Sequence, residues 1–149
     1  MIKRHLPFLR TSAVCSVGLC GIAGSAFAAS EIKGAAILDH PCGKVAVKQT
    51  GLLHSGKMEE ANKLSTKEMQ DEYKAMPAKD REMMNGMAKM MSPTEEKFAA
   101  MIKSSGVLVI DGQAATLTTK TTTKDKNGSS TESTTQKFRI TGSECLVSR

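Results

Sequence analysis

The stretch VLVIDGQAATLTTKTTTKDKNGSSTESTTQKFRITGSECLVS, residues 107–148, decides the fold class. Apolar and polar residues alternate in it, and β-branched side chains dominate, which is typical of strands with one buried face. Turn signals at Asp111-Gly112, in the loop 125–128 and at Thr141-Gly142 divide the stretch. The result is four predicted strands: Val107–Ile110, Ala114–Lys124, Ser130–Ile140 and Cys145–Ser148.

Strands that follow one another through tight turns predict an antiparallel meander. The alternating apolar positions predict one inward face, which includes Ala115, Leu117, Phe138 and Ile140. The many threonines and serines suit a strand whose other face is wet, so this region does not have the pattern of a mucin-like linker.

Residues 37–105 carry the signals of helices instead. Asp39 is a suitable cap for a helix that begins near Pro41 and stops at Gly56. The stripe expected to be buried on it is Cys42, Val45, Ala46, Gln49, Leu52 and Leu53. A short helix follows with Met58, Ala61 and Leu64 on its buried face.

Two capping boxes open later helices, Ser65-Thr66-Lys67-Glu68 and Ser92-Pro93-Thr94-Glu95, and Pro77 begins another between them. The last helix ends at Gly106. The apolar positions expected on these helices are Met69, Tyr73 and Met76, then Met83, Met84, Met87, Met90 and Met91, then Phe98, Met101 and Ile102. Helices packed on one face of a four-stranded antiparallel sheet predict an α+β fold.

The first 28 residues have the pattern of a secretory signal peptide. Lys3, Arg4 and Arg10 form a basic start, a short apolar stretch follows, and 25–28 (Ser-Ala-Phe-Ala) predicts cleavage after Ala28. We therefore expect general secretion into the periplasm or the medium, and a mature chain, residues 29–149, that is a single domain without membrane insertion. Its helical part is 37–105 and its sheet 107–148.

Removal of residues 1–28 also changes the charge balance. Without their three basic residues, the mature chain has 18 basic residues against 15 acidic ones, a net charge of +3. This is typical of an ordinary solvated surface, so we expect no nucleic-acid partner.

The turns and hydrophobicity of the mature chain resemble NTF2-like proteins. A helix that ends in Gly51-Leu-Leu-His-Ser-Gly-Lys-Met-Glu-Glu-Ala-Asn-Lys-Leu64 is similar to their opening, and Val107–Thr118 with Gln136–Val147 is similar to their closing strands. The resemblance is to the small exported members of the DUF4878 and SnoaL-like groups. It implies a curved sheet around helices, the cystatin/NTF2-like cone, with a cavity for a small apolar ligand, and it allows a homodimer through the sheet. Cys145 stands where relatives often have Trp in the final strand.

The two cysteines of the mature chain, Cys42 and Cys145, are expected to form a disulfide, because paired cysteines are usual in exported domains. The proposed architecture places Cys42 on the inward face of the first helix and Cys145 on the last strand. A metal or redox site is the less favoured interpretation, since redox cysteines are normally close in sequence.

Methionines are the main candidates for chemistry. Thioether sulfur is a soft ligand suited to Cu(I), and Met83, Met84, Met87, Met90 and Met91 follow one another on one predicted helix, with His40 or His54 available to complete a site. The favoured interpretation is that these methionines fill a core or line a groove. Each histidine is more typical of a surface or capping position than of a metal ligand.

We find no catalytic constellation in the sequence. Asp39 fits a cap and Asp111 a turn, and neither has an evident acid–base partner. Tyr73 is the one tyrosine available for a ketosteroid-isomerase type of site, and no match to that motif can be drawn. A nucleophile elbow and a phosphate loop are absent as well.

Three functions follow as hypotheses. The first is a non-enzymatic exported domain, without cofactor, that binds a small apolar ligand or an envelope protein. The cavity residues expected for it are Tyr73, Met84, Met87, Phe98, Leu117 and Phe138. The second is a periplasmic Cu(I)- or Ag(I)-binding protein that uses Met83–Met91, and the third is a SnoaL-like enzyme.

Overall fold

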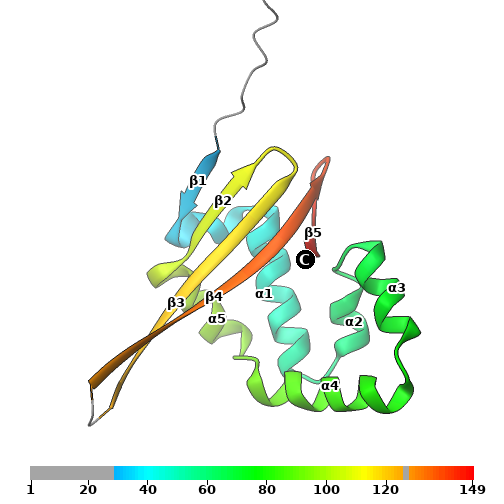
Figure 1. Cartoon of the computed structure of the whole chain (residues 1–149). Helices are drawn as coiled ribbons and strands as arrows, with labels where there is room; N and C mark the ends of the chain where they lie inside the picture. Colours follow the sequence, from blue (N-terminus) through cyan, green and yellow to red (C-terminus); the bar gives the residue numbers. More distant parts are fainter. Residues whose placement is uncertain (1–28, 126–127) are drawn as a thin grey trace, which may run out of the picture.

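The structure is a computed structural model that describes residues 29–125 and 128–149, with the side chains of 124 and 125 left aside. The predicted signal peptide, residues 1–28, lies outside the described residues. Within them the fold is α+β, as expected, with a five-stranded sheet and six helices (Figure 1). The helices are η1 (Gly34–Asp39, a 3-10 helix), α1 (Pro41–His54), α2 (Met58–Asn62), α3 (Lys67–Ala75), α4 (Ala78–Met91) and α5 (Glu95–Ser105).

The sheet is an antiparallel meander in the order β1-β2-β3-β4-β5. Its strands are β1 (Ser30–Lys33), β2 (Val107–Asp111), β3 (Ala114–Asp125), β4 (Gly128–Thr141) and β5 (Glu144–Ser148). The prediction of four strands was wrong, because β1 pairs with β2 at the edge, Ser30 opposite Ile110. This strand has only four residues and a single apolar one, Ile32, so it has no alternation to detect. The β3–β4 hairpin extends beyond the helices as a ribbon (Figure 1).

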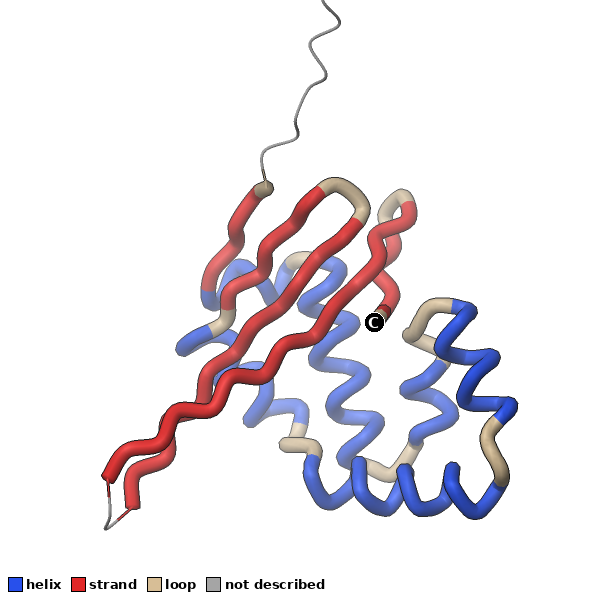
Figure 2. Tube along the Cα trace, viewed as in Figure 1, coloured by secondary structure: helices blue, strands red, loops and turns tan. Residues whose placement is uncertain are grey.

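The core lies between one face of the sheet and the helices α1, α5 and η1. Figure 2 shows the helices gathered on that face. The alternation predicted for the strands holds, since Ala115, Leu117 and Phe138 are buried and Ile140 packs against them half-buried. Ile37, Ala46, Phe98 and Ile102 complete the helix side. The expected disulfide joins Cys42 to Cys145, and both residues are buried in this core.

A helical lobe, defined as α2, α3 and α4 (Met58–Met91), lies beside the sheet (Figure 1). It is attached to the edge strand β5 through the linker 64–66. Thr66 N–H donates to the Val147 carbonyl at 2.8 Å, and Val147 N–H donates to the Leu64 carbonyl at 2.9 Å. The linker therefore covers the free edge of β5, which would otherwise expose unpaired backbone groups.

Helix ends lie close to the sequence signals, but the caps differ from those expected. The expected capping boxes begin at Ser65 and Ser92, whereas the N-cap of α3 is Thr66, without a side-chain cap hydrogen bond, and the N-cap of α5 is Thr94. Thr94 caps α5 by accepting a hydrogen bond from Lys97 N–H at 3.3 Å, and Gly106 follows its last residue. Asp39, expected to cap α1, belongs instead to η1, and His40 is the cap. The ring nitrogen Nδ1 of His40 accepts the Cys42 N–H at 3.2 Å. None of the described helices has the length and apolarity needed to cross a bilayer.

Candidate functional site

The helical pocket is a cavity of about 240 Å³ that lies between α1 and the helical lobe. Its walls are mostly apolar and come from four helices and the turn after α3. Leu53 belongs to α1, Met58 and Ala61 to α2, and Met69 to α3. The remaining apolar wall residues are Met76, Met84 and Ala88, with Tyr73 as the aromatic one. Four methionines from three different segments of the lobe thus border one small space.

One side of this pocket is formed by a buried amide network. The Gln49 side chain donates from Nε2 to Ser65 Oγ at 3.2 Å and lies 3.4 Å from the Ala61 carbonyl. Its Oε1 accepts from Gln136 Nε2 at 2.6 Å. Because buried amides are costly to leave unpaired, this network fixes α1, α2 and β4 relative to one another.

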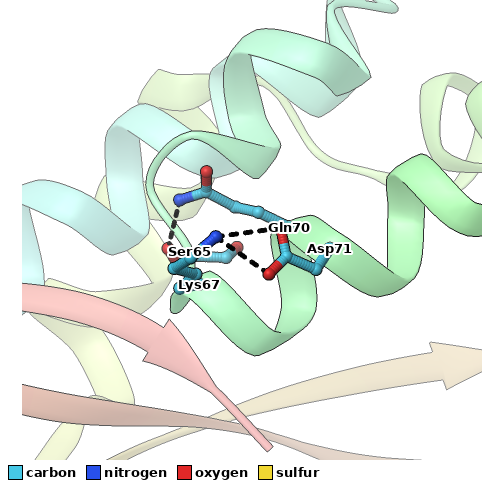
Figure 3. A network of polar contacts seen from close by, with 4 residues as sticks. All are labelled: Ser65, Lys67, Gln70 and Asp71. Atoms are coloured by element: carbon cyan, nitrogen blue, oxygen red, sulfur yellow. Dashed lines mark hydrogen bonds and ion pairs between the residues drawn. The ribbon is translucent and has the colours of Figure 1, made fainter.

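The rim of the pocket is polar and includes the C-terminal residue. Arg149 forms an ion pair with Glu72 of α3, and both side chains border the pocket. The orientation of α3 is set at its start, where Gln70 Nε2 donates to the Ser65 carbonyl at 2.8 Å (Figure 3). Lys67 and Asp71, at 3.0 Å, add an exposed ion pair one turn apart (Figure 3). These contacts place Met69 and Tyr73 toward the pocket.

A larger polar groove of about 580 Å³ borders the far side of Tyr73. The Arg81 guanidinium lies over the Tyr73 ring, 5.8 Å from its centroid, which is within the range of a cation–π contact. Three bases and three acids line the groove: Lys57, Lys63, Arg81, Glu59, Glu60 and Glu82. Their balance gives no preference for a ligand of either charge, so we regard the helical pocket as the better candidate site.

The six residues expected to share a cavity do not share one. Phe98, Leu117 and Phe138 are buried in the core between helices and sheet. Tyr73 and Met84 line the helical pocket, whereas Met87 does not and is 52% exposed. The aromatic rings of Phe98 and Phe138 fill the space beneath the sheet.

The outer face of α4, defined as Met83, Met87, Met90 and Met91, is solvent-exposed. Its side chains are 60%, 52%, 84% and 77% exposed, and α4 has no buried residue. The expectation that the methionines of this helix fill a core is therefore wrong, whereas the alternative that they line a groove holds for Met84, at the helical pocket, and for Met91, at a pocket beside α5. The cause is the orientation of α4. Arg81, Asn85 and Ala88 of this helix lie toward the rest of the lobe, and its apolar stripe therefore lies on the solvent side.

The two histidines that the structure describes, His40 and His54, have structural contacts. His40 caps α1, and burial lowers its pKa, as suits a ring nitrogen that accepts a hydrogen bond. His54 Nδ1 lies 2.9 Å from the Ser92 carbonyl and ties the end of α1 to the end of α4. Asp39 and Asp111 are exposed, as is every other acidic side chain that the structure describes.

The sequence predicts Met58 on the buried face of one helix and Met69 with Met76 on the buried face of the next, and it does not bring the two faces together. The signal that was present is the spacing Met69, Tyr73, Met76, which puts three pocket residues on one face of α3 and its end. Periodicity does not show which helix packs against which.

The comparisons with protein-family models, curated proteins and solved structures found no match to this chain.

Proposed function

We propose that this protein is a non-enzymatic, exported binding domain whose ligand site is the helical pocket. The observation that carries the proposal is a concave, mostly apolar space with a polar rim, built by four helices and the chain's last residue. Sites of this kind, with few polar groups placed among apolar walls, are the usual form of small-ligand sites.

The size of the pocket limits the ligand. A volume of about 240 Å³ exceeds the roughly 150 Å³ of an apolar cavity that binds benzene and lies below the roughly 300–1,000 Å³ of drug-sized sites. The ligand is therefore small and contacts carbon and sulfur atoms more than charges, as a small apolar molecule or a soft ion does.

Two further proposals concern compartment and ancestry. The disulfide between Cys42 and Cys145 supports export, because such bonds persist in oxidising compartments, and export agrees with the predicted signal peptide. We also propose an NTF2-like relationship of the DUF4878 type. Helices packed on one face of an antiparallel meander support it.

An envelope-protein partner is the alternative within the same function. It would use the outer face of α4, since exposed methionines are suited to adaptable protein contacts. The helical pocket is favoured because it is concave and ordered by a buried hydrogen-bond network, whereas the outer face of α4 is convex.

The proposal is tested by filling the pocket. Ala88 borders it, and Ala88→Phe places a ring into the space; the matched control is Ala100→Phe, an exposed alanine of α5. Each protein is isolated from the periplasm of a secreting host and measured by native mass spectrometry. We expect a bound mass, metal or organic, on the unmodified protein and on Ala100→Phe, and its loss from Ala88→Phe.

Equal bound mass on all three proteins, or none on the unmodified one, contradicts the proposal. Far-UV circular dichroism and thermal unfolding check that Ala88→Phe is folded. If it is not, Ala88→Leu fills less of the pocket and takes its place.

A further inference from the structure

We infer that the ligand of the helical pocket is a soft monovalent metal ion, Cu(I) or Ag(I), bound by the thioether sulfurs of Met58, Met69, Met76 and Met84. This inference rests on the proposed function, whose site it shares, and narrows the class of ligand. It departs from the sequence hypothesis, which placed the metal on Met83–Met91.

The first support is convergence. Met58 begins α2, Met69 lies in α3, Met76 ends α3 and Met84 lies in α4, yet all four border a space of about 240 Å³. Methionine has three rotatable bonds, so its sulfur can reach a central ion without movement of the backbone. Met84 is 36% exposed, less than any member of the outer face of α4.

The second support is the type of donor. Thioether sulfur is soft and binds Cu(I) far better than Mg²⁺ or Ca²⁺, which need oxygen ligands. Four neutral donors bring no charge to compensate a divalent ion in an apolar pocket, whereas a monovalent ion is easier to bury. A site made of thioethers alone therefore selects a soft ion of single charge.

The third support is that the carboxylate and the Gln49 amide at the pocket already have partners within the protein. Glu72, a carboxylate at the pocket, is paired with Arg149. Gln49 Oε1 accepts from Gln136, and its Nε2 is a donor, which cannot bind a cation. The described residues also contain no cluster of three His, Cys, Asp or Glu side chains able to hold a metal. Besides the sulfur atoms, the pocket is lined by the side chains of Asn62 and Tyr73, whose oxygen atoms are harder ligands than a soft ion prefers.

The simpler interpretation is that these methionines only fill gaps between helices. Substitution by leucine separates the two, because leucine keeps the apolar volume and removes the sulfur. The chain supplies a matched control, since three methionines of the outer face of α4 can be changed in the same way.

The experiment titrates Ag(I), added as the nitrate in chloride-free buffer, into three proteins followed by calorimetry. They are the unmodified mature chain, the pocket variant Met69→Leu/Met76→Leu/Met84→Leu and the outer variant Met83→Leu/Met87→Leu/Met90→Leu. Ag(I) is the probe because it is redox-inert here and leaves the disulfide intact. We expect one site in the unmodified protein and in the outer variant, and an affinity lower by roughly 100-fold or more in the pocket variant, because removal of outer-shell groups alone costs 10–100-fold.

An affinity unchanged in the pocket variant, an affinity lost in the outer variant, or no binding by the unmodified protein each overturns the inference. If the pocket variant does not fold, Ala88→Phe replaces it, since it blocks the pocket and keeps every thioether.

The failure of the metal inference can be distinguished from the failure of the proposed binding site. If Ag(I) does not bind but a bound organic mass is lost in Ala88→Phe, the metal inference falls and the binding site stands. If no mass is bound either, both fall.

Discussion

Cys42, the second residue of α1, is bonded to Cys145 in β5 across 103 residues of sequence. The bond holds the first long helix against the last strand, and both sulfurs lie in the core. The linker 64–66 forms hydrogen bonds with the same strand, so the disulfide also helps to position the helical lobe.

Removing this disulfide is expected to destabilise the domain. In the chain-entropy model a closed loop of about 100 residues contributes about 4.7 kcal/mol, less any strain in the folded state. We expect Cys42→Ala/Cys145→Ala to lose about 3–5 kcal/mol in urea unfolding. Reduction of the unmodified protein should give a similar loss. A loss below about 1 kcal/mol in both measurements would contradict the role given to this bond.

Titration of His40 is expected to make stability depend on pH. Burial lowers its pKa below the ordinary value of about 6.5, so the unfolded chain binds the proton more readily than the folded one. The contribution of His40 to the free energy of unfolding is therefore present above pH 6.5 and declines as the pH falls below it. Protonation also removes the Nδ1 acceptor of the α1 cap.

The variants His40→Asn and His40→Ala separate capping from titration. Asparagine keeps a cap acceptor and should remove the pH dependence with little change at pH 7.5. Alanine should lose about 0.5–2 kcal/mol at every pH, as is usual for a lost cap. Unfolding free energies at pH 5.5 and 7.5 decide this. An unchanged pH dependence in His40→Asn would show that another group carries it.

Thr119 is expected to be replaceable by valine with a gain in stability. Its side chain is 2% exposed, and its hydroxyl has no hydrogen-bond partner among the described residues. Valine has the same shape without the hydroxyl, so Thr119→Val should raise the unfolding free energy by about 1 kcal/mol. Thr118→Val, on the opposite face of β3, is the control and should stay within about 0.5 kcal/mol. A loss of stability in Thr119→Val refutes the prediction.

The amide network at the pocket is expected to be stabilising. Gln49→Leu leaves the buried hydroxyl of Ser65 and the amide of Gln136 without their partner, for an expected loss of about 1–3 kcal/mol. Gln113→Leu, at an exposed turn position, is the matched control. The double variant Gln49→Leu/Gln136→Leu should lose less than the sum of the single losses. Strict additivity would mean that the two amides do not interact.

Local signals in the sequence predicted most of the fold. The period of two in residues 107–148 and the turn pairs placed β2 to β5 within a residue or two of their ends. Pro41, the segment 92–95 and Gly106 marked helix ends. The Cys42–Cys145 pair was predicted as well. The sequence did not predict β1, because the feature that identifies this strand is its pairing with β2, more than seventy residues away in the sequence.

The site was less predictable for a related reason. Periodicity identifies the apolar stripe of a helix and not its neighbour, so Met83–Met91 were expected inside although α4 turns this stripe to solvent. Phe98 and Phe138 were expected to share a cavity with Tyr73 and Met84, and they lie in the core, outside the helical pocket. The helical pocket depends on how α2, α3 and α4 pack against α1, which is information held in no single segment.

The most direct test of the division between pocket and outer face is a methionine methyl NMR spectrum during titration with Ag(I). The mature protein is labelled at the methionine ε-methyl carbons, and each signal is assigned by a single Met→Leu substitution. We predict that one equivalent of Ag(I) shifts the signals of Met58, Met69, Met76 and Met84 and leaves those of Met83, Met87, Met90 and Met91 in place. Shifts confined to the second group, or in neither group, would contradict the account.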